Sequence, residues 1–262
     1  MHKISKQKLE KVYERYNKRE LVDPDPLVFL YDYSDIRDRE IAGLIAATLA
    51  YGRVAQILKN VAKVLKVMGT SPSSYLADSS PSQIEKDLKG FKHRFTTEQE
   101  MTAMLVAIKK AVQKYGSLEA LFLRSYKREH ESVIPALAKF VIELKTLGGI
   151  KKSSLLSDPT MESACKRLNL YLRWMVRCDK VDPGGWKKVS ASKLIIPLDT
   201  HMFKFGKCYE FTQRRNAGLK TAMEITAGFR KIAPLDPTKY DFAITRFGIR
   251  SDMCWQDLEN IR

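Results

Sequence analysis

The chain has 262 residues, enough for one large domain or two small ones, and 44% of them are hydrophobic, which can fill a core. Lysine and arginine outnumber aspartate and glutamate by 46 to 30, giving a formal charge of +16. This balance favours nucleic acid or an anionic membrane surface as the partner, and the alternative is a basic protein that binds neither. The sequence has no apolar run of about 18 residues, so we expect no transmembrane span.

The N-terminus, the cysteines and the histidines argue against several classes of protein. Residues 1–20 are charged and contain no apolar signal core, so we expect a cytoplasmic protein. The four cysteines are spaced too widely for a zinc ribbon or an iron–sulfur site, and we expect reduced core residues at Cys165, Cys178, Cys208 and Cys254. The four histidines are scattered, so we expect no metal site.

Helical periodicity runs through the first part of the chain. Apolar spacing, caps and breaks predict helices at 5–19, from Ser34 or Asp35 to about Tyr51, between Gly52 and Gly69, from Pro81, between Thr97 and Gly116, at 117–126 and at 131–147. The apolar face of the second helix comprises Ile41, Leu44, Ile45, Thr48 and Leu49.

A loop-like stretch at 148–160 is the best candidate in the sequence for a boundary between domains. Helical patterns then resume at 161–177, 200–209, 218–232 and 237–247, and residues 179–193 form a polar loop. Alternating strand patterns are nearly absent, so the fold is predicted to be all-α.

The stretch from Met161 to Phe205 carries the candidate chemistry. Its apolar run Leu194–Leu198 stops at Asp199, which has the position of an N-cap that stays ionised and holds a fixed place. Lys166 lies near the start of a helix beside Arg167, and both the helix dipole and this neighbour disfavour its charged form, which suits an amine nucleophile. A surface lysine and a plain N-cap are the alternatives.

Two segments resemble the helix-hairpin-helix DNA glycosylase superfamily. The segment beginning LIIPLDTHMFKF has its apolar–Asp–Thr–His–apolar pattern, and residues 39–69 are similar to its N-terminal helix pair, whose junction reads Ala50-Tyr51-Gly52-Arg53. The segments KRLNLYLRWMVR and IIPLDTH resemble an uncharacterised bacterial branch of conserved hypothetical proteins, related to that superfamily, more closely than they resemble the superfamily as a whole. The layout is also similar to archaeal-type 8-oxoguanine DNA glycosylases, in which a long loop separates the lysine from the aspartate.

The resemblance implies an all-α, two-lobed, DNA-glycosylase-like fold with a degenerate helix-hairpin-helix. We expect a single domain over 1–262, with the N-terminal helices and 200–262 in one lobe and about 75–198 in the other. Two features of the superfamily are missing from the sequence. The place of its glycine-rich hairpin is taken by Leu155–Thr160, and the cysteine cluster of its endonuclease-type members does not occur.

The resemblance also implies a base-excision mechanism on double-stranded DNA, with oxidised purines as the expected lesions. A damaged base is flipped out, and Asp199 stabilises the developing sugar cation. Lys166 attacks the sugar carbon and forms a Schiff base, which permits β-elimination of the 3′ phosphate, the AP-lyase step. No metal or organic cofactor is expected.

Aromatic and basic residues complete the expected site. The base-pocket candidates are Trp186, Trp174 and Tyr51, with core burial as the alternative for Trp174 and Tyr51. The nucleic-acid contacts expected from their charge are Arg53, Arg167, Arg173, Arg177, Lys187, Lys188, His201 and Lys204.

Other functions fit the same sequence. One alternative is a non-catalytic nucleic-acid-binding protein that keeps the glycosylase fold, which the altered hairpin favours. RNA as the substrate is another. We expect a monomer, by analogy with the superfamily alone.

Overall fold

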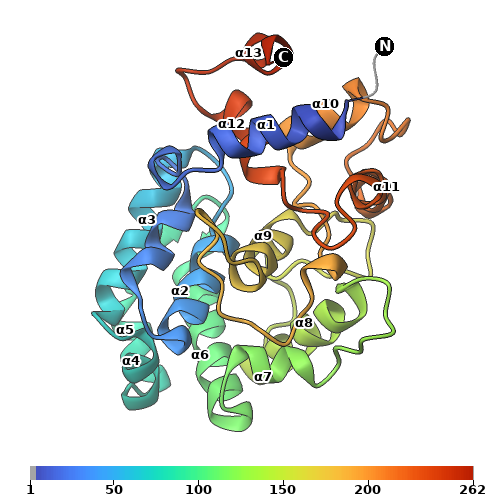
Figure 1. Cartoon of the computed structure of the whole chain (residues 1–262). Helices are drawn as coiled ribbons and strands as arrows, with labels where there is room; N and C mark the ends of the chain where they lie inside the picture. Colours follow the sequence, from blue (N-terminus) through green and yellow to red (C-terminus); the bar gives the residue numbers. More distant parts are fainter. Residues whose placement is uncertain (1–3, 262) are drawn as a thin grey trace. The chain divides into compact units, whose positions relative to one another are not determined.

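The computed structural model describes residues 4–261, and its helices are joined by loops (Figure 1). The prediction of a mostly helical protein is confirmed. Within these residues, paired β-structure is confined to a short hairpin and a single bridge. Strands β1 (Lys92–His93) and β2 (Thr96–Thr97) pair antiparallel, and the bridge joins Ser163 to Gly218.

The described chain forms two compact units. The middle unit comprises Pro24–His130 and Ile134–Asp158, and the C-terminal unit comprises the residues up to Asp23, Glu131–Val133 and the residues from Pro159 on. These boundaries differ from those of the expected lobes, because the middle unit includes residues 24–74 and the C-terminal unit includes 159–198. The single two-lobed domain stays a prediction.

The middle unit contains seven α-helices among its described residues, and most begin at a local cap. Their bounds are α2 (Ile36–Thr48), α3 (Val54–Met68), α4 (Pro72–Asp78), α5 (Pro81–Asp87), α6 (Glu98–Tyr115), α7 (Leu118–Leu123) and α8 (Ile134–Gly148), preceded by the 3₁₀ helix η2 (Pro26–Asp32). Asp35, one of the two predicted caps, caps α2, and Thr97, which precedes the predicted helix, forms a capping box with Glu100. Helix α4 was not predicted, although Ser71 and Pro72 repeat the cap-plus-proline signal of α5.

Helix α2 is the core of the middle unit. Every residue from Glu40 to Ala50 is buried, so burial extends beyond the predicted apolar stripe to the alanine-rich side of the helix. The one acid in this run, Glu40, accepts hydrogen bonds from the backbone N–H groups of Leu118 (2.7 Å) and Glu119 (3.0 Å). This pairing offsets the cost of burying a carboxylate and ties α2 to the first turn of α7.

The C-terminal unit brings the first helix of the chain beside its last ones. Its α-helices are α1 (Lys6–Tyr16), α9 (Lys166–Val176), α10 (Thr200–Cys208), α11 (Leu219–Ile232), α12 (Asp241–Ile249) and α13 (Trp255–Asn260), and its 3₁₀ turns are η1 (Arg19–Leu21) and η3 (Ala191–Lys193). Helix α1 packs against α12 (Figure 1), and the rings of Tyr16 and Phe247 meet edge to face at 4.7 Å.

Two helices of the C-terminal unit begin later than predicted. Helix α9 starts at Lys166 and not at 161, because Ser163 pairs with Gly218 and Cys165 adopts a left-handed conformation (φ 46°) that interrupts the helical path. Helix α12 starts at Asp241 and not at 237. Helix α13 was not predicted.

The cysteine prediction is correct for one residue of four. Cys165 is buried, whereas Cys178, Cys208 and Cys254 are exposed free thiols. Over residues 4–261, no helix combines the length and the apolar character that crossing a membrane requires.

Candidate functional site

Lys166 is the first residue of α9, and the backbone before it is held in an unusual conformation. The N-cap residue Cys165 has φ 46° and ψ 40° and makes no side-chain cap. The backbone N–H of Cys165 donates to Ser163 Oγ (3.2 Å), and Asn169 Nδ2 donates to the carbonyl of Ala164 (2.9 Å). A non-glycine residue in this region costs about 1 kcal/mol or more, so the surrounding bonds hold the turn in place.

The Lys166 side chain itself is half-buried. Between residues 4 and 261, no hydrogen bond or ion pair involves its amine. The chain therefore holds the backbone of this lysine while its amine stays available for chemistry.

Asp199 caps α10, which confirms the N-cap prediction. Its Oδ1 accepts from the backbone N–H of Met202 (2.7 Å), and the side chain is half-buried. The other carboxylate oxygen has no hydrogen-bond partner in the described part of the chain. The preceding apolar run is anchored where the N–H of Ile196 donates to Thr226 Oγ1 in α11 (3.0 Å), so Asp199 projects from a fixed backbone.

Lys166 and Asp199 belong to the same unit but share no direct contact among the described residues. Asp241 in α12 interacts both with the helix of Lys166, through Arg173, and with the charge of Asp199. Arg173 lies two turns beyond Lys166, about 10 Å along the helix, and pairs with Asp241. Burial raises the pKa of Asp241 to about 6 against the opposing charge of Arg173, and the negative charge of Asp199 adds to the rise. The convergence of Lys166 and Asp199 on one sugar carbon stays a prediction.

Arg173 and Arg177 are buried among aspartates, which corrects their expected role as phosphate contacts. Their side chains are 3% exposed, and both bind Asp182, whose carboxylate is fully buried. Arg173 also pairs with Asp241, and Arg177 pairs with Asp179 (2.8 Å) and Asp236 (2.9 Å). A phosphate could not reach these guanidinium groups without breaking the network. They tie α9 to the loop at 178–186 and to the start of α12.

The two tryptophans of the expected base pocket lie in the core. Trp174 is 0% and Trp186 is 1% exposed. The loop before Trp186 folds back on α9, where the N–H of Gly184 bonds to the carbonyl of Trp174 (3.0 Å) and that of Trp186 to the carbonyl of Met175 (2.8 Å). The Trp186 ring packs edge to face on Tyr171 at 5.3 Å. Neither indole offers a free face to a base. The core alternative is correct for Trp174, and the pocket expectation for Trp186 is corrected.

Tyr51 lies in the middle unit and supports the β-hairpin. Its hydroxyl donates to the carbonyl of His93 (2.8 Å) and lies 2.7 Å from Thr96 Oγ1. The buried His93 ring bonds to Asn60 (2.8 Å) and to the carbonyl of Tyr51 (3.0 Å). Tyr51 therefore supports the hairpin, and its place in a base pocket stays a prediction. Arg53, which precedes α3, is exposed as expected.

The tip of this hairpin carries an exposed aromatic residue that the sequence analysis missed. Phe95 is 72% exposed, and the Arg94 guanidinium lies 5.3 Å from the centre of its ring. Arg94 has φ 51°, and its side chain packs so closely on Gly52 that a Cβ there would lie 2.7 Å from Arg94 Cδ. The only sequence signal was the basic–aromatic order of Lys92 to Phe95, which helical periodicity does not detect.

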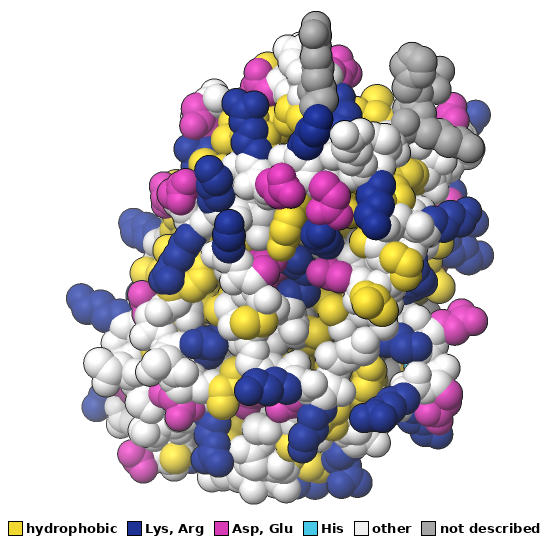
Figure 2. Space-filling model, viewed as in Figure 1, with side chains coloured by type: hydrophobic (Ala, Val, Ile, Leu, Met, Phe, Trp, Pro, Cys, Tyr) yellow, Lys and Arg dark blue, Asp and Glu magenta, His cyan; other side chains and the backbone are white. Residues whose placement is uncertain are grey.

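The basic side chains are spread over the surface and are not gathered in a single patch. Lys187, Lys188 and Lys204 are exposed, and Arg167 and His201 are half-buried. Figure 2 shows Lys and Arg side chains distributed over the visible face. The exposed lysines stay candidates for phosphate contact. Positive surface charge of this kind attracts a polyanion over long distances.

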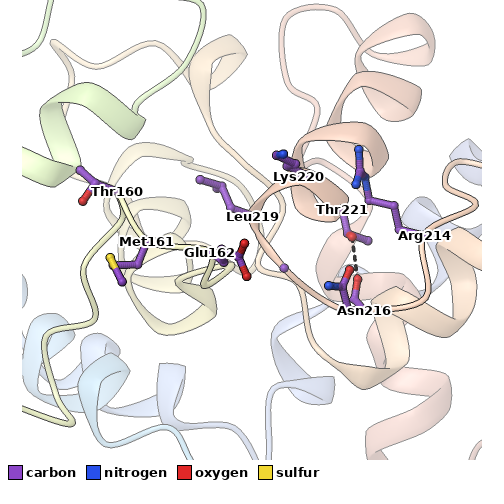
Figure 3. A pocket seen from close by; sticks show the side chains of 9 residues that line it. Thr160, Met161, Glu162, Arg214, Asn216, Leu219, Lys220 and Thr221 are labelled. Atoms are coloured by element: carbon purple, nitrogen blue, oxygen red, sulfur yellow. Dashed lines mark hydrogen bonds between the residues drawn. The ribbon is translucent and has the colours of Figure 1, made fainter.

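A cavity of about 270 Å³ opens in the C-terminal unit just before the Lys166 helix (Figure 3). It lies between Thr160–Glu162 and the segment from Arg214 to Thr221. The backbone N–H of Leu219 donates to the carbonyl of Glu162 (2.8 Å), and Thr221 Oγ1 donates to the carbonyl of Asn216 (2.6 Å), which hold the two walls. None of the predicted site residues lines it.

A family model described as "Protein of unknown function (DUF2400)" matches residues 25–250. The match covers α2 to α12 and leaves out α1 and α13. Comparisons with curated proteins and with solved structures returned no match.

Proposed function

Since the chain belongs to the DUF2400 family of proteins of unknown function, we propose a function from its own residues: removal of oxidised purine bases from DNA, followed by cleavage at the resulting abasic site. The observation that carries this proposal is the state of Lys166 and Asp199. Within the described chain, the amine of Lys166 and one oxygen of Asp199 are unengaged, and both residues lie in the same compact unit on rigidly held backbone.

In the proposed reaction, Lys166 is the nucleophile and Asp199 stabilises positive charge. The nitrogen of Lys166 attacks C1′ of the sugar, and the base departs with the electron pair of the glycosidic bond. The Asp199 carboxylate stabilises the positive charge that develops on the sugar, an effect worth roughly 3 kcal/mol in a site shielded from water. The nitrogen then loses its proton, the sugar ring opens to an imine, and loss of a C2′ proton expels the 3′ phosphate.

The resemblance to helix-hairpin-helix glycosylases supports a DNA substrate, and so does the surface of the middle unit. In that resemblance the junction Ala50–Arg53 faces the DNA, and Arg94 of the hairpin packs on Gly52 in this junction. Phe95 and its partner Arg94 thus provide a stacking surface and a cation side by side. Such a pair suits contact with an unstacked base and its phosphate.

Borohydride trapping on duplexes that contain 8-oxoguanine or an abasic site tests the enzyme. The wild-type protein should form a covalent adduct, because borohydride reduces the imine between lysine and sugar. Lys166→Gln should form none, whereas the matched control Lys231→Gln, which changes an exposed lysine of the same unit that has no proposed role, should form as much as the wild type. An adduct that persists in Lys166→Gln contradicts the assignment of the nucleophile.

A second candidate is a nucleic-acid-binding protein without catalysis. The burial of Trp174 and Trp186 favours it, because two of the three aromatic residues expected in the base pocket lie in the core. This candidate predicts salt-sensitive duplex binding and no borohydride adduct on any lesion. Adding RNA duplexes to the same binding assay separates a DNA partner from an RNA partner.

A further inference from the structure

The C-terminal helix α13 lies against the face of α10 that carries two of the expected phosphate contacts. The ring of Trp255 stacks on that of His201, with centroids 6.5 Å apart and an interplanar angle of 28°. The Lys204 ammonium lies 5.6 Å from the centre of the Trp255 ring. His201 and Lys204 are three residues apart, so they share one face of α10, and a single indole contacts both, while the rest of the Lys204 side chain stays exposed.

His201 itself is held from a different helix. A Cβ on Gly248 in α12 would lie 2.0 Å from His201 Nδ1, so only glycine leaves room for this ring. The position of His201 is therefore set by α10 and α12, both within the family match. Trp255 comes from α13, which lies outside it.

Several features indicate that α13 is weakly held and can detach from α10. The helix has six residues, too few to be stable without tertiary contacts, and exposed residues Ser251 and Asp252 precede it. A cavity of about 170 Å³ remains beneath it, between Trp255 and the α10 residues Phe205 and Cys208. Its anchors are the buried side chain of Leu258 and a bond from Lys8 Nζ to the carbonyl of Glu259 (2.8 Å).

The charge of this segment is opposite to that of the rest of the chain. Residues 251–261 contain three carboxylates, Asp252, Asp257 and Glu259, and no lysine or arginine, in a protein with a formal charge of +16. The aromatic ring of this segment stacks on His201 and contacts Lys204 as a nucleotide base could, whereas Asp252 pairs with Arg250 and Asp257 accepts from the backbone N–H of Cys254.

We propose that α13 is an autoinhibitory cover, in which Trp255 occupies the face of α10 at His201 and Lys204 and withdraws when a nucleic-acid strand binds this face. The proposal rests on nucleic acid being the partner. It implies that the full chain binds nucleic acid more weakly than the chain without α13 would, because the strand must first displace this helix.

Duplex affinity measured by fluorescence anisotropy at one salt concentration tests the cover. Trp255→Ala should bind about fivefold more tightly than the wild type, the lower end of typical coupling between two sites. A chain ending at Arg250 should show the same gain. The gain should vanish when His201→Ala and Lys204→Ala are added. Leu235→Ala, which removes a residue that is 83% exposed elsewhere in the same unit, should not change the affinity.

Indole fluorescence provides a second readout that needs no destabilised variant. Trp174 and Trp186 are buried, so the wild-type emission minus that of Trp255→Phe reports on Trp255. Duplex binding should shift this difference toward a more solvated indole. Unchanged Trp255 emission in the bound wild type overturns the cover, as does equal or weaker binding by Trp255→Ala that melts like the wild type.

The outcomes separate this proposal from the proposed function. Equal binding by every variant, together with a Lys166-dependent adduct, overturns the cover alone. If the wild type and both cover variants bind no nucleic acid, the cover and the proposed function both fail.

Discussion

Asp199 has two oxygens in different surroundings, and this allows its two roles to be separated. One oxygen caps α10 through Met202, and the other has no partner among residues 4–261. The first role is structural and needs only an acceptor, whereas stabilising a sugar cation needs the negative charge.

Asp199→Asn should separate these roles. The amide oxygen can still accept from Met202, so the melting temperature should stay near that of the wild type, while the rate of adduct formation should fall about 100-fold or more. Asp199→Ala loses the cap as well and should lower the free energy of unfolding by about 1 kcal/mol. Thermal melting and trapping rates measure the two effects. A fully active Asn variant contradicts the electrostatic role.

Asp241 should make stability depend on pH in a defined window. Burial raises its pKa from 3.8 to about 6, so the folded protein holds this proton more tightly than the unfolded chain. Its contribution to stability is therefore full below about pH 4 and is lost as pH rises toward 6.

Urea unfolding of the wild type and Asp241→Asn across this window measures that contribution. The free energy of unfolding of the wild type, relative to the variant, should decrease between pH 4 and 6 and then level off. A difference that is constant, or that increases with pH, contradicts the inferred burial cost of the Asp241 carboxylate.

At the scale of single elements, the signals that predict helix ends are local, and they succeeded. Asp35, Thr97 and Asp199 cap helices as expected, since a cap depends on residues within one turn. The start of α9 was wrong because it depends on Ser163 pairing with Gly218, far along the chain. Periodicity within a window cannot detect such a partner.

The same distinction between local signals and distant partners applies to the site residues. The cap that Asp199 provides could be read from neighbouring residues, whereas the place of Lys166 as the first residue of α9 could not, because it depends on the pairing of Ser163 with Gly218. The burial of Arg173 could not, because its partner Asp241 is 68 residues further along. The exposure of Phe95 depends on a hairpin of two-residue strands, which is too short to show an alternating pattern.

The hairpin provides a prediction at this scale. Phe95→Ala should weaken duplex binding about tenfold, since stacking on a base is worth about 1–3 kcal/mol. It should leave the melting temperature unchanged, because the ring is 72% exposed. Anisotropy and thermal melting check both parts, and Ile142→Ala, at an exposed apolar position in α8 of the same unit, is the matched control. Equal losses in both variants would show that the tip has no specific role.

At the scale of the whole molecule, composition favours nucleic acid or an anionic membrane surface as the partner, which stays a prediction, and the division into units came from the structure. The formal charge of +16 is a property of the sequence alone. The grouping of α9 with α12 depends on buried ion pairs between distant residues, which neither composition nor periodicity contains. These pairs account for the presence of residues 159–198 in the C-terminal unit.

The charge predicts a steep dependence of binding on salt. The logarithm of the duplex affinity should fall linearly with the logarithm of salt concentration, and replacing Lys187 and Lys188 together by Gln should reduce the slope by about two if each contacts a phosphate. Anisotropy titrations over a salt series measure the slope. An unchanged slope places these exposed lysines outside the interface.

The most direct test of the central claim is peptide mapping of the borohydride-trapped complex by mass spectrometry. The account predicts a reduced sugar adduct on the peptide that contains Lys166, with fragmentation placing the added mass on that lysine. An adduct on any other lysine, or on the N-terminal amine, would contradict it.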